Sequence, residues 1–195
     1  MQPAMDIPAN ELAGRVVRLE IITEAHREGL RKAAADPKIW QFLPMDGSGT
    51  QFDRWFDAAL ATQAAGTQIV YAVRRISNDR LIGSTRLANL VPDHKRVEIG
   101  YTWYATLAHG GPVNPECKLL LLDHAFSHGA NRVELKTDAR NTHSQAAIAK
   151  LGATREGTLR AHMVARDGFV RDSIYFSIIR PEWPELRDKL RARLG

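Results

Sequence analysis

Ten residues near the middle of the chain carry the pattern of an anion-binding loop. The segment 109–118 reads HGGPVNPECK, with a glycine pair, two prolines and a helix-capping asparagine. It lies between a strand-like segment (97–104, VEIGYTWY) and an apolar helical one (119–126, LLLLDHAF). Backbone N–H groups at a helix start are unpaired and carry partial positive charge, so they attract phosphates. The pattern indicates a phosphate-bearing ligand, with an ordinary capped helix as the alternative.

Each residue type in this loop has its own use. The glycine pair 110–111 allows a tight turn and lets a ligand come close to the backbone. We predict Asn114 as the N-cap and Pro115 as the first helical residue, where a missing N–H does no harm. His109 and Lys118 are candidates to add hydrogen bonds and charge to a phosphate.

A second polar segment follows the next predicted strand and starts the next helix. Residues 138–144 read DARNTHS, and Asn141 and Ser144 lie three apart on one helix face. Asn141 is a candidate to accept a hydrogen bond from a ligand amide, and Ser144 offers a hydroxyl. The alternative is that Asn141 only caps its helix and Ser144 is exposed.

Hydrophobic periodicity and turn residues predict a mixed α/β domain. We expect a central sheet of about seven strands with helices on both faces. The strands at 97–104 and 132–138 should run parallel because a helix connects them, and a ligand would sit at their carboxyl ends. The predicted strands cover 15–22, 68–75, 81–90, 97–104, 132–138, 155–164 and 170–179, and the helices cover 23–35, 50–66, 114–128, 142–151 and a segment from 181 onward.

Length and composition fit one globular domain. The 195 residues (1–195) are 44% hydrophobic and 25% charged, and we expect the first eleven to be flexible. Lysine and arginine are scattered, so the net charge of +5 favours a solvated surface over nucleic-acid binding. No apolar run is long enough to span a membrane. The lone cysteine, Cys117, and an N-terminus without a signal-peptide pattern predict a cytoplasmic location.

Taken together, these segments resemble the GNAT superfamily of N-acetyltransferases, and most of all its RimJ/RimL branch of ribosomal-protein N-terminal acetyltransferases. The resemblance runs from about residue 12 to 187. It implies a GNAT fold that binds acetyl-CoA and releases CoA, with the thioester between splayed central strands and the pyrophosphate on loop 109–114. The matching residues are Glu98–Tyr101, Val113–Lys118, Arg132–Asp138, Asn141 with Ser144, Ala147-Ile148, Leu151–Ala153, Glu156-Gly157, Leu159-Arg160, Arg171-Asp172 and Glu182-Trp183.

The resemblance also assigns roles on the cofactor side. Backbone N–H groups of Trp103, Tyr104 and Ala105 would stabilise an oxyanion, and Ser144 would contact or protonate the leaving thiolate. The loop departs from the usual Arg/Gln-x-x-Gly-x-Gly/Ala pattern, since its two prolines lack an N–H. We expect His109, Val113, Asn114 and Lys118, with the glycine pair (Gly110 and Gly111), to hold the cofactor instead.

The general base does not follow directly from the family pattern. Some RimL-like enzymes carry a glutamate where this chain reads RAHM (160–163). We therefore place the base at Glu98, because a carboxylate buried in a central strand holds a proton more readily. Its alternative is a structural ion pair with an arginine. His162 is the second candidate, and its alternative is an ordinary half-buried strand histidine.

Two other reactive residue types receive no catalytic role. Cys117 lies in the first turn of a helix, which lowers a thiol pKa, but no His/Asp pattern accompanies it and the family uses no such nucleophile. His124 and His128 have helical i, i+4 spacing but lack a third ligand, so we expect no metal.

On the acceptor side, the segment 40–49 (WQFLPMDGSG) connects the first two predicted helices. In the resembled fold this region flanks the acceptor. Trp40 and Phe42 are candidates to shape a pocket, and Asp46 is a candidate to hold an ammonium group. Ordinary packing and turn chemistry are the alternatives.

The leading hypothesis is an acetyl-CoA-dependent N-acetyltransferase that acts on a protein N-terminus or on a small amine. A non-catalytic acyl-CoA-binding or ribosome/RNA-associated domain is the alternative, and a different acyl-CoA donor is a third. No membrane partner is expected. A homodimer through the segment around Trp183 is a further hypothesis.

Overall fold

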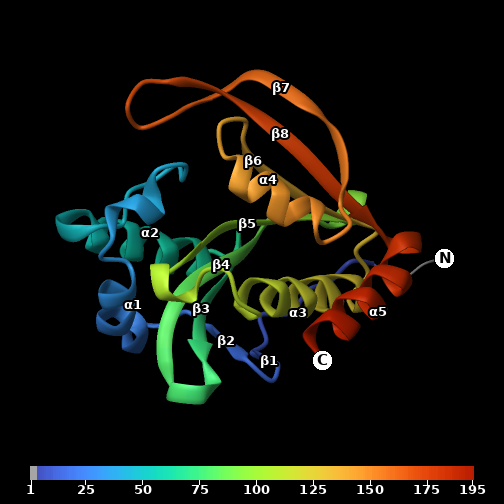
Figure 1. The fold of residues 1–195 in the computed structure, drawn as a ribbon, viewed down its shortest axis with the longest axis horizontal. Helices are drawn as coiled ribbons and strands as arrows, with labels where there is room; N and C mark the ends of the chain where they lie inside the picture. Colours follow the sequence, from blue (N-terminus) through green and yellow to red (C-terminus); the bar gives the residue numbers. More distant parts are fainter. Residues whose placement is uncertain (1–3) are drawn as a thin grey trace.

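A computed structural model describes residues 4–195 of the chain (Figure 1). Its eight strands are β1 (Leu12–Ala13), β2 (Val17–Ile21), β3 (Ile69–Arg75), β4 (Arg80–Val91), β5 (Arg96–Tyr104), β6 (Arg132–Asp138), β7 (Thr154–Val164) and β8 (Val170–Ile179). Its α-helices are α1 (Arg27–Ala33), α2 (Phe52–Ala64), α3 (Val113–Ser127), α4 (Thr142–Ala149) and α5 (Trp183–Leu194). The mixed α/β class and most boundaries agree with the prediction. The additional strand, β1, is only two residues long, too short for a periodicity to reveal.

The strands form one sheet in the order β1-β2-β3-β4-β5-β6-β8-β7. Every neighbouring pair is antiparallel except β5 and β6, which run parallel as predicted. These two strands pair only from Arg96 to Glu98 with Arg132 to Glu134. Beyond that point β6 continues to pair with β8, so β5 and β6 separate toward their carboxyl ends. We call this separation the fork.

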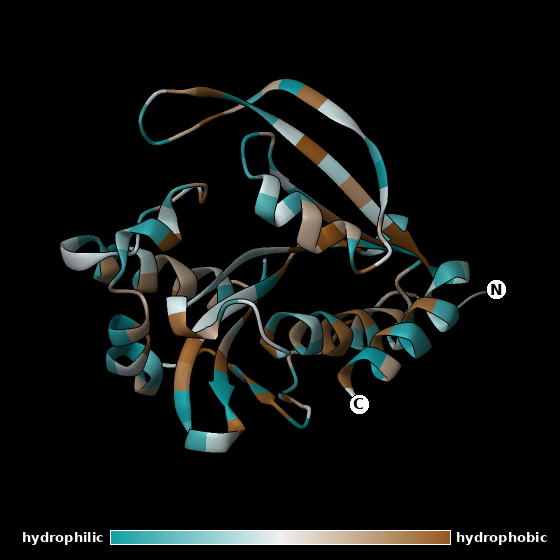
Figure 2. Ribbon diagram, in the orientation of Figure 1, coloured by the Kyte–Doolittle hydropathy of each residue, from teal (hydrophilic) through white to brown (hydrophobic). Residues whose placement is uncertain are grey.

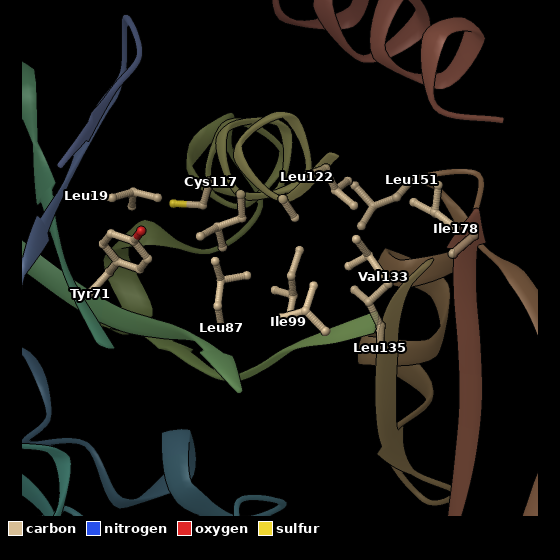
Figure 3. Close-up of a cluster of buried hydrophobic side chains, with 14 of the residues drawn as sticks. Leu19, Tyr71, Leu87, Ile99, Cys117, Leu122, Val133, Leu135, Leu151 and Ile178 are labelled. Atoms are coloured by element: carbon tan, nitrogen blue, oxygen red, sulfur yellow. The ribbon is translucent and has the colours of Figure 1, made fainter. Parts of the chain in front are cut away.

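An apolar core fills the face of the sheet under α3, α4 and α5. Leu122 of α3 meets Leu87 and Ile99 of the sheet, and Leu151 after α4 joins the same cluster (Figure 3). The brown bands on α3 and on the strands beneath it in Figure 2 mark these surfaces. Burial of a continuous apolar layer is the main force that holds these helices on the sheet.

The opposite face has a smaller, aromatic core under α1 and α2. Trp40, Trp55 and Trp103 pack edge to face or tilted, with ring centroids 5.0 to 5.5 Å apart. The indole nitrogen of Trp40 donates to the carbonyl of Ala34 at 2.9 Å. α1 and α2 pack over β4 and β3, so this core ends near β5.

The chain ends pack against α3. The ring of Trp183 is buried and stacks on Phe126 at 5.5 Å, and its nitrogen donates to Asp123. This side chain is therefore used inside the molecule, and a homodimer through the surrounding segment stays a prediction. Near the other end, Met5 and Ile7 are buried in the main core. The expected flexibility of the first eleven residues stays a prediction, and residues 1–3 lie outside the described residues.

One predicted helix start is wrong. The sequence predicts that Thr50 and Asp53 cap α2 together, but the helix begins at Phe52 after a 3-10 turn (Gly49–Gln51). The Asp53 carboxylate instead binds the guanidinium groups of Arg27 and Arg31. Within the described residues, no helix combines the length and apolar character that a membrane span needs.

Candidate active site

Glu98 lies at the base of the fork, on the face of the sheet opposite α3. Its side chain is 3% exposed. One carboxylate oxygen, Oε2, accepts hydrogen bonds from Asn89 Nδ2 (2.7 Å) and Lys136 Nζ (2.8 Å). The anticipated structural alternative, a buried ion pair, is present, with a lysine in place of the arginine.

The second oxygen of Glu98, Oε1, lies against Gly100. A Cβ on Gly100 would come within 2.7 Å of this oxygen, so only glycine leaves it room. Oε1 accepts no hydrogen bond from residues 4–195. The two oxygens are thus inequivalent: Oε2 is fixed by Asn89 and Lys136, and Oε1 remains available to a water molecule or an amine.

Lys136, Tyr175 and His162 extend the polar site along β6, β8 and β7. Burial alone lowers the pKa of Lys136, but the hydrogen bond and charge of Glu98 raise it overall, so its ammonium form persists. Lys136 Nζ lies 5.9 Å from the Tyr175 ring centre, and the His162 ring meets Tyr175 edge to face at 5.7 Å. These contacts join residues that lie far apart in the sequence.

His162 is held in its neutral form. Burial lowers its pKa, and the charges of Lys136 and Arg171 lower it further. Its Nδ1 is buried and has no hydrogen-bond partner within residues 4–195. A neutral imidazole with a free nitrogen can accept a proton, so the second candidate base keeps the required chemistry.

A bulge in β5 shapes the mouth of the fork. The register between β4 and β5 shifts between Ser84 and Arg86, and Tyr101 adopts a φ of +52°. A bulge leaves a residue out of the ladder and redirects backbone groups. The N–H of Ala105 donates to the carbonyl of Ile82 at 2.7 Å, so it is not available as an oxyanion donor. Strand alternation directs the N–H of Tyr104 the opposite way, toward the fork.

The loop after β5 has the open backbone that the glycine pair predicts. Gly110 has a φ of +77°, and a Cβ on either Gly110 or Gly111 would meet no described atom within 4 Å. His109 Nε2 lies 3.0 Å from the carbonyl oxygen of Tyr104 and so holds the loop to the strand.

The start of α3 differs from the predicted one. The helix begins at Val113 with Pro112 in the cap position, so Asn114 is not the cap. Asn114 Oδ1 instead accepts from the Tyr104 hydroxyl at 3.3 Å. The first N–H groups of α3 still lie beside the open glycine backbone, where a phosphate group fits both the space and the helix dipole.

Lys118 does not reach this loop. Its side chain is buried, and Nζ donates to Thr102 Oγ1 at 2.7 Å beneath β5. Cys117 is also buried, and burial raises its pKa to about 12. The expected lowering by the helix start is outweighed by desolvation, because a thiolate here would have no water around it.

The start of α4 lies beyond the carboxyl end of β6, across the fork from α3. Asn141 Oδ1 accepts from the backbone N–H of Ser144 at 3.0 Å, which is the capping arrangement given as the alternative. Ser144 is half-buried. Its hydroxyl group is therefore the available ligand contact on this side.

A cavity of about 400 Å³ lies between the segment after α1 and the β7–β8 hairpin, whose turn projects toward that segment in Figure 1. Phe42 lines it, and its role toward an acceptor stays a prediction. Trp40 instead belongs to the aromatic core, and Asp46 binds the Arg166 guanidinium at 2.6 Å, so it does not offer a free carboxylate. The lining residues are Pro37, Lys38, Gln41–Pro44, Asp138, Arg140, Met163–Asp167 and Arg171.

Four residues of this face received no site role in the sequence analysis: Lys136, Tyr175, Arg86 and Arg171. Arg86 is buried over the rings of Trp55 and Tyr101, and burial lowers its pKa to about 10. The available signal was strand alternation, since polar residues at 132, 134 and 136 alternate with apolar ones along β6, and polar residues at 173, 175 and 177 do so along β8, where Arg171 shares their face. No group of three or more metal-ligating side chains occurs within residues 4–195.

The comparisons with known proteins agree on the family. Residues 17–154 match the family model of the acetyltransferase (GNAT) domain. A GCN5-related N-acetyltransferase from Brucella melitensis is 25% identical with a TM-score of 0.92, covering 100% of this chain and 90% of that one. A T. thermophilus protein assigned as an acetyltransferase is 33% identical with a TM-score of 0.84, covering 95% and 97%. None of the curated proteins matches.

The family match spans most of the chain, and the chain belongs to the GNAT acetyltransferase family. Mycobacterium smegmatis RimJ, solved in complex with CoA-disulfide, is 21% identical with a TM-score of 0.76, covering 98% of this chain and 93% of that one. At that identity the likeness extends to the fold, and the RimJ/RimL branch stays a prediction.

Proposed function

We propose that this protein transfers the acetyl group of acetyl-CoA to a primary amine. The observation that carries the proposal is the fork: two parallel strands separate directly above a buried, half-satisfied carboxylate, Glu98. An open glycine backbone and the start of α3 lie at the end of one strand, and the start of α4 lies at the end of the other. Family membership supports the same chemistry.

On the cofactor side, backbone groups would bind acetyl-CoA more than side chains do. The N–H groups of Gly110, Gly111, Val113 and Asn114 would hold the pyrophosphate of acetyl-CoA, which supplies the acetyl thioester. The N–H of Tyr104 would face the thioester carbonyl oxygen, and the Ser144 hydroxyl would face the sulfur. Trp103 supports the strand from the aromatic core, and His109 fixes the loop.

On the acceptor side, an ammonium group must lose a proton before its nitrogen can attack. We assign the base to Glu98, acting through Oε1 directly or through one water molecule. Asn89 and Lys136 hold the carboxylate in place through Oε2. His162 is the second candidate, because it is neutral and has an unpartnered nitrogen.

The acceptor would approach from the 400 Å³ cavity, on the face of β6 and β8 that α1 and α2 leave open. A protein N-terminus, as in the RimJ/RimL branch, and a small amine both remain candidate acceptors. The cytoplasmic location suggested by the lone cysteine belongs to the same proposal.

Calorimetric titration with acetyl-CoA, CoA and ATP tests the cofactor first. We expect both CoA species to bind and ATP not to bind. Thiol release with a panel of amines then tests transfer. If acetyl-CoA binds but no amine gives thiol release, a non-catalytic acyl-CoA-binding domain becomes the better description.

A further inference from the structure

Within residues 4–195, the cavity on the acceptor side contains one arginine that forms no direct ion pair, although the Asp138 carboxylate is close enough for its pKa to be lowered by this arginine's charge. Arg140 binds Asp138 at 2.7 Å, and Arg166 binds Asp46 at 2.6 Å. Arg171 lies within 4 Å of no carboxylate in residues 4–195, although it is only 6% exposed. Of the three arginines that line this cavity, Arg140 and Arg166 each form an ion pair, and Arg171 forms none within residues 4–195.

Arg171 is held in place by neutral oxygens. Its Nε and one terminal nitrogen lie 3.3 and 3.1 Å from Ser173 Oγ, and its other terminal nitrogen donates to the Phe42 carbonyl at 3.3 Å. These contacts use three of the five N–H groups of a guanidinium, and two face no described partner. The side chain is therefore oriented in advance, and it forms no direct ion pair with a carboxylate of residues 4–195.

A buried cation without a directly bonded counterion is costly, and a carboxylate is the ligand that best compensates it. A guanidinium binds a carboxylate through two parallel, charge-assisted hydrogen bonds. From this arrangement we infer that the acceptor amine carries a carboxylate, which Arg171 recognises in the cavity. This inference rests on the proposed function, since it names the acceptor class of the same site.

The position of Arg171 also sets the spacing within the acceptor. Arg171 and Tyr175 lie on the same face of β8, four residues apart, which is about 13 Å along a strand. Tyr175 adjoins Lys136 and thereby the fork. The arginine side chain bridges part of that distance, so the carboxylate and the amine must lie several bonds apart. A long amino acid meets this requirement, and so does an acidic side chain near the start of a peptide.

Two matched acceptor pairs separate these sources. One pair is 6-aminohexanoate and hexylamine, and the other is the peptide amides Ser-Ala-Asp-Ala and Ser-Ala-Asn-Ala. Thiol release from acetyl-CoA gives kcat/KM for each. We expect the wild-type protein to favour the carboxylate-bearing member of at least one pair by about 10-fold or more. The pair that shows the preference identifies the source of the carboxylate.

The variant Arg171→Gln should reduce that preference to near unity, mainly through KM, while CoA affinity stays unchanged. Arg160→Gln is the control, because it removes an equal charge from an exposed position on β7. If Arg171→Gln fails to fold because the bond to Phe42 is lost, Arg171→Lys keeps the charge without the paired hydrogen bonds. It should retain part of the preference.

Three results would overturn the inference: equal rates within both pairs for the wild type, an undiminished preference in Arg171→Gln, or a loss of CoA affinity in that variant. The last result would assign Arg171 to the cofactor. Absence of thiol release with every amine would instead reject the proposed function itself, so the two failures are distinguishable.

Discussion

The N-terminal half of α3 and the base of the fork each hold one glutamate and one lysine, yet they use them differently. In α3, the Glu116 carboxylate accepts from the backbone N–H groups of Arg15, Val16 and Val17 at 2.7 to 2.8 Å. Among the described residues, Lys118 of the same helix donates only to a hydroxyl, that of Thr102. At the fork, Glu98 and Lys136 bind each other.

The pKa values of the two lysines follow from these partners. Burial lowers the pKa of Lys118 to about 8, because no carboxylate within the described residues offsets the loss of water. Lys136 is also desolvated, but Glu98 raises its pKa overall. Residue types are the same in both regions, but Lys118 is buried and Lys136 is half-buried, so burial and the partner together decide whether a charge serves the fold or stays available for chemistry. The following variants test this distinction, from the largest expected effect to the smallest.

Glu116→Gln should cause the largest change, and it should affect stability. A glutamine offers one acceptor oxygen and directs an NH₂ group at the same backbone donors, so buried N–H groups lose their partner. We expect the free energy of unfolding to fall by about 3 to 5 kcal/mol. Urea denaturation measures it, with the exposed Glu185→Gln as the control. An unfolding midpoint equal to the wild type would mean that the carboxylate does not anchor β2.

Lys118→Met should change the pH dependence of stability. Between pH 8 and 10.5 the unfolded chain holds a proton on this lysine that the folded protein has lost. Wild-type stability should therefore rise with pH across that interval relative to the variant, by roughly 3 kcal/mol for the full shift. Below pH 8 the folded protein bears the whole cost of the buried ammonium. Urea denaturation of both proteins at several pH values tests this, and parallel curves would contradict it.

These two regions also show how far the sequence leads. The helix at 113–127, the parallel strands and the open glycine backbone follow from local patterns, because turn residues and periodicity act over a few neighbours. The prediction that Lys118 lies at the phosphate loop is wrong. Helical spacing tells which residues share a face of α3, but it does not tell which of these faces the sheet buries. The pairing of Glu98 with Lys136 joins two strands, and the cavity joins 37–44 to 163–171. Such contacts depend on sheet order, which no local pattern contains.

Glu98→Gln should affect turnover more than stability. The amide cannot accept a proton, so we expect kcat to fall by about 100-fold while CoA affinity stays close to the wild type. Lys136 would lose its ion partner, which is why the unfolding midpoint must be measured alongside. Thiol release at saturating acceptor gives kcat. The decrease in kcat should be larger than the unfolded fraction of the variant can account for.

The pH profile distinguishes the two candidate bases. Activity falls at low pH as the base becomes protonated, and this acidic limb disappears when the base itself is removed. If Glu98 is the base, the limb vanishes in Glu98→Gln and persists in His162→Gln. The reverse pattern would assign the role to His162, whose limb should lie below the ordinary histidine range because its pKa is lowered by burial and by Lys136.

Gly111→Val should produce the smallest effect, confined to the cofactor. Gly111 has no left-handed backbone to strain, and a Cβ there meets no described atom within 4 Å, so the fold should tolerate the side chain. A bound pyrophosphate would meet it, because the glycine leaves the backbone open for close approach. We expect CoA affinity to fall by about 10-fold with an unchanged unfolding midpoint. Calorimetry measures the affinity, and Gly157→Val is the matched control, because this glycine of β7 also has open space around it and no left-handed backbone. Unchanged CoA affinity in Gly111→Val would remove the loop from the cofactor site and leave only the start of α4 to hold the phosphates.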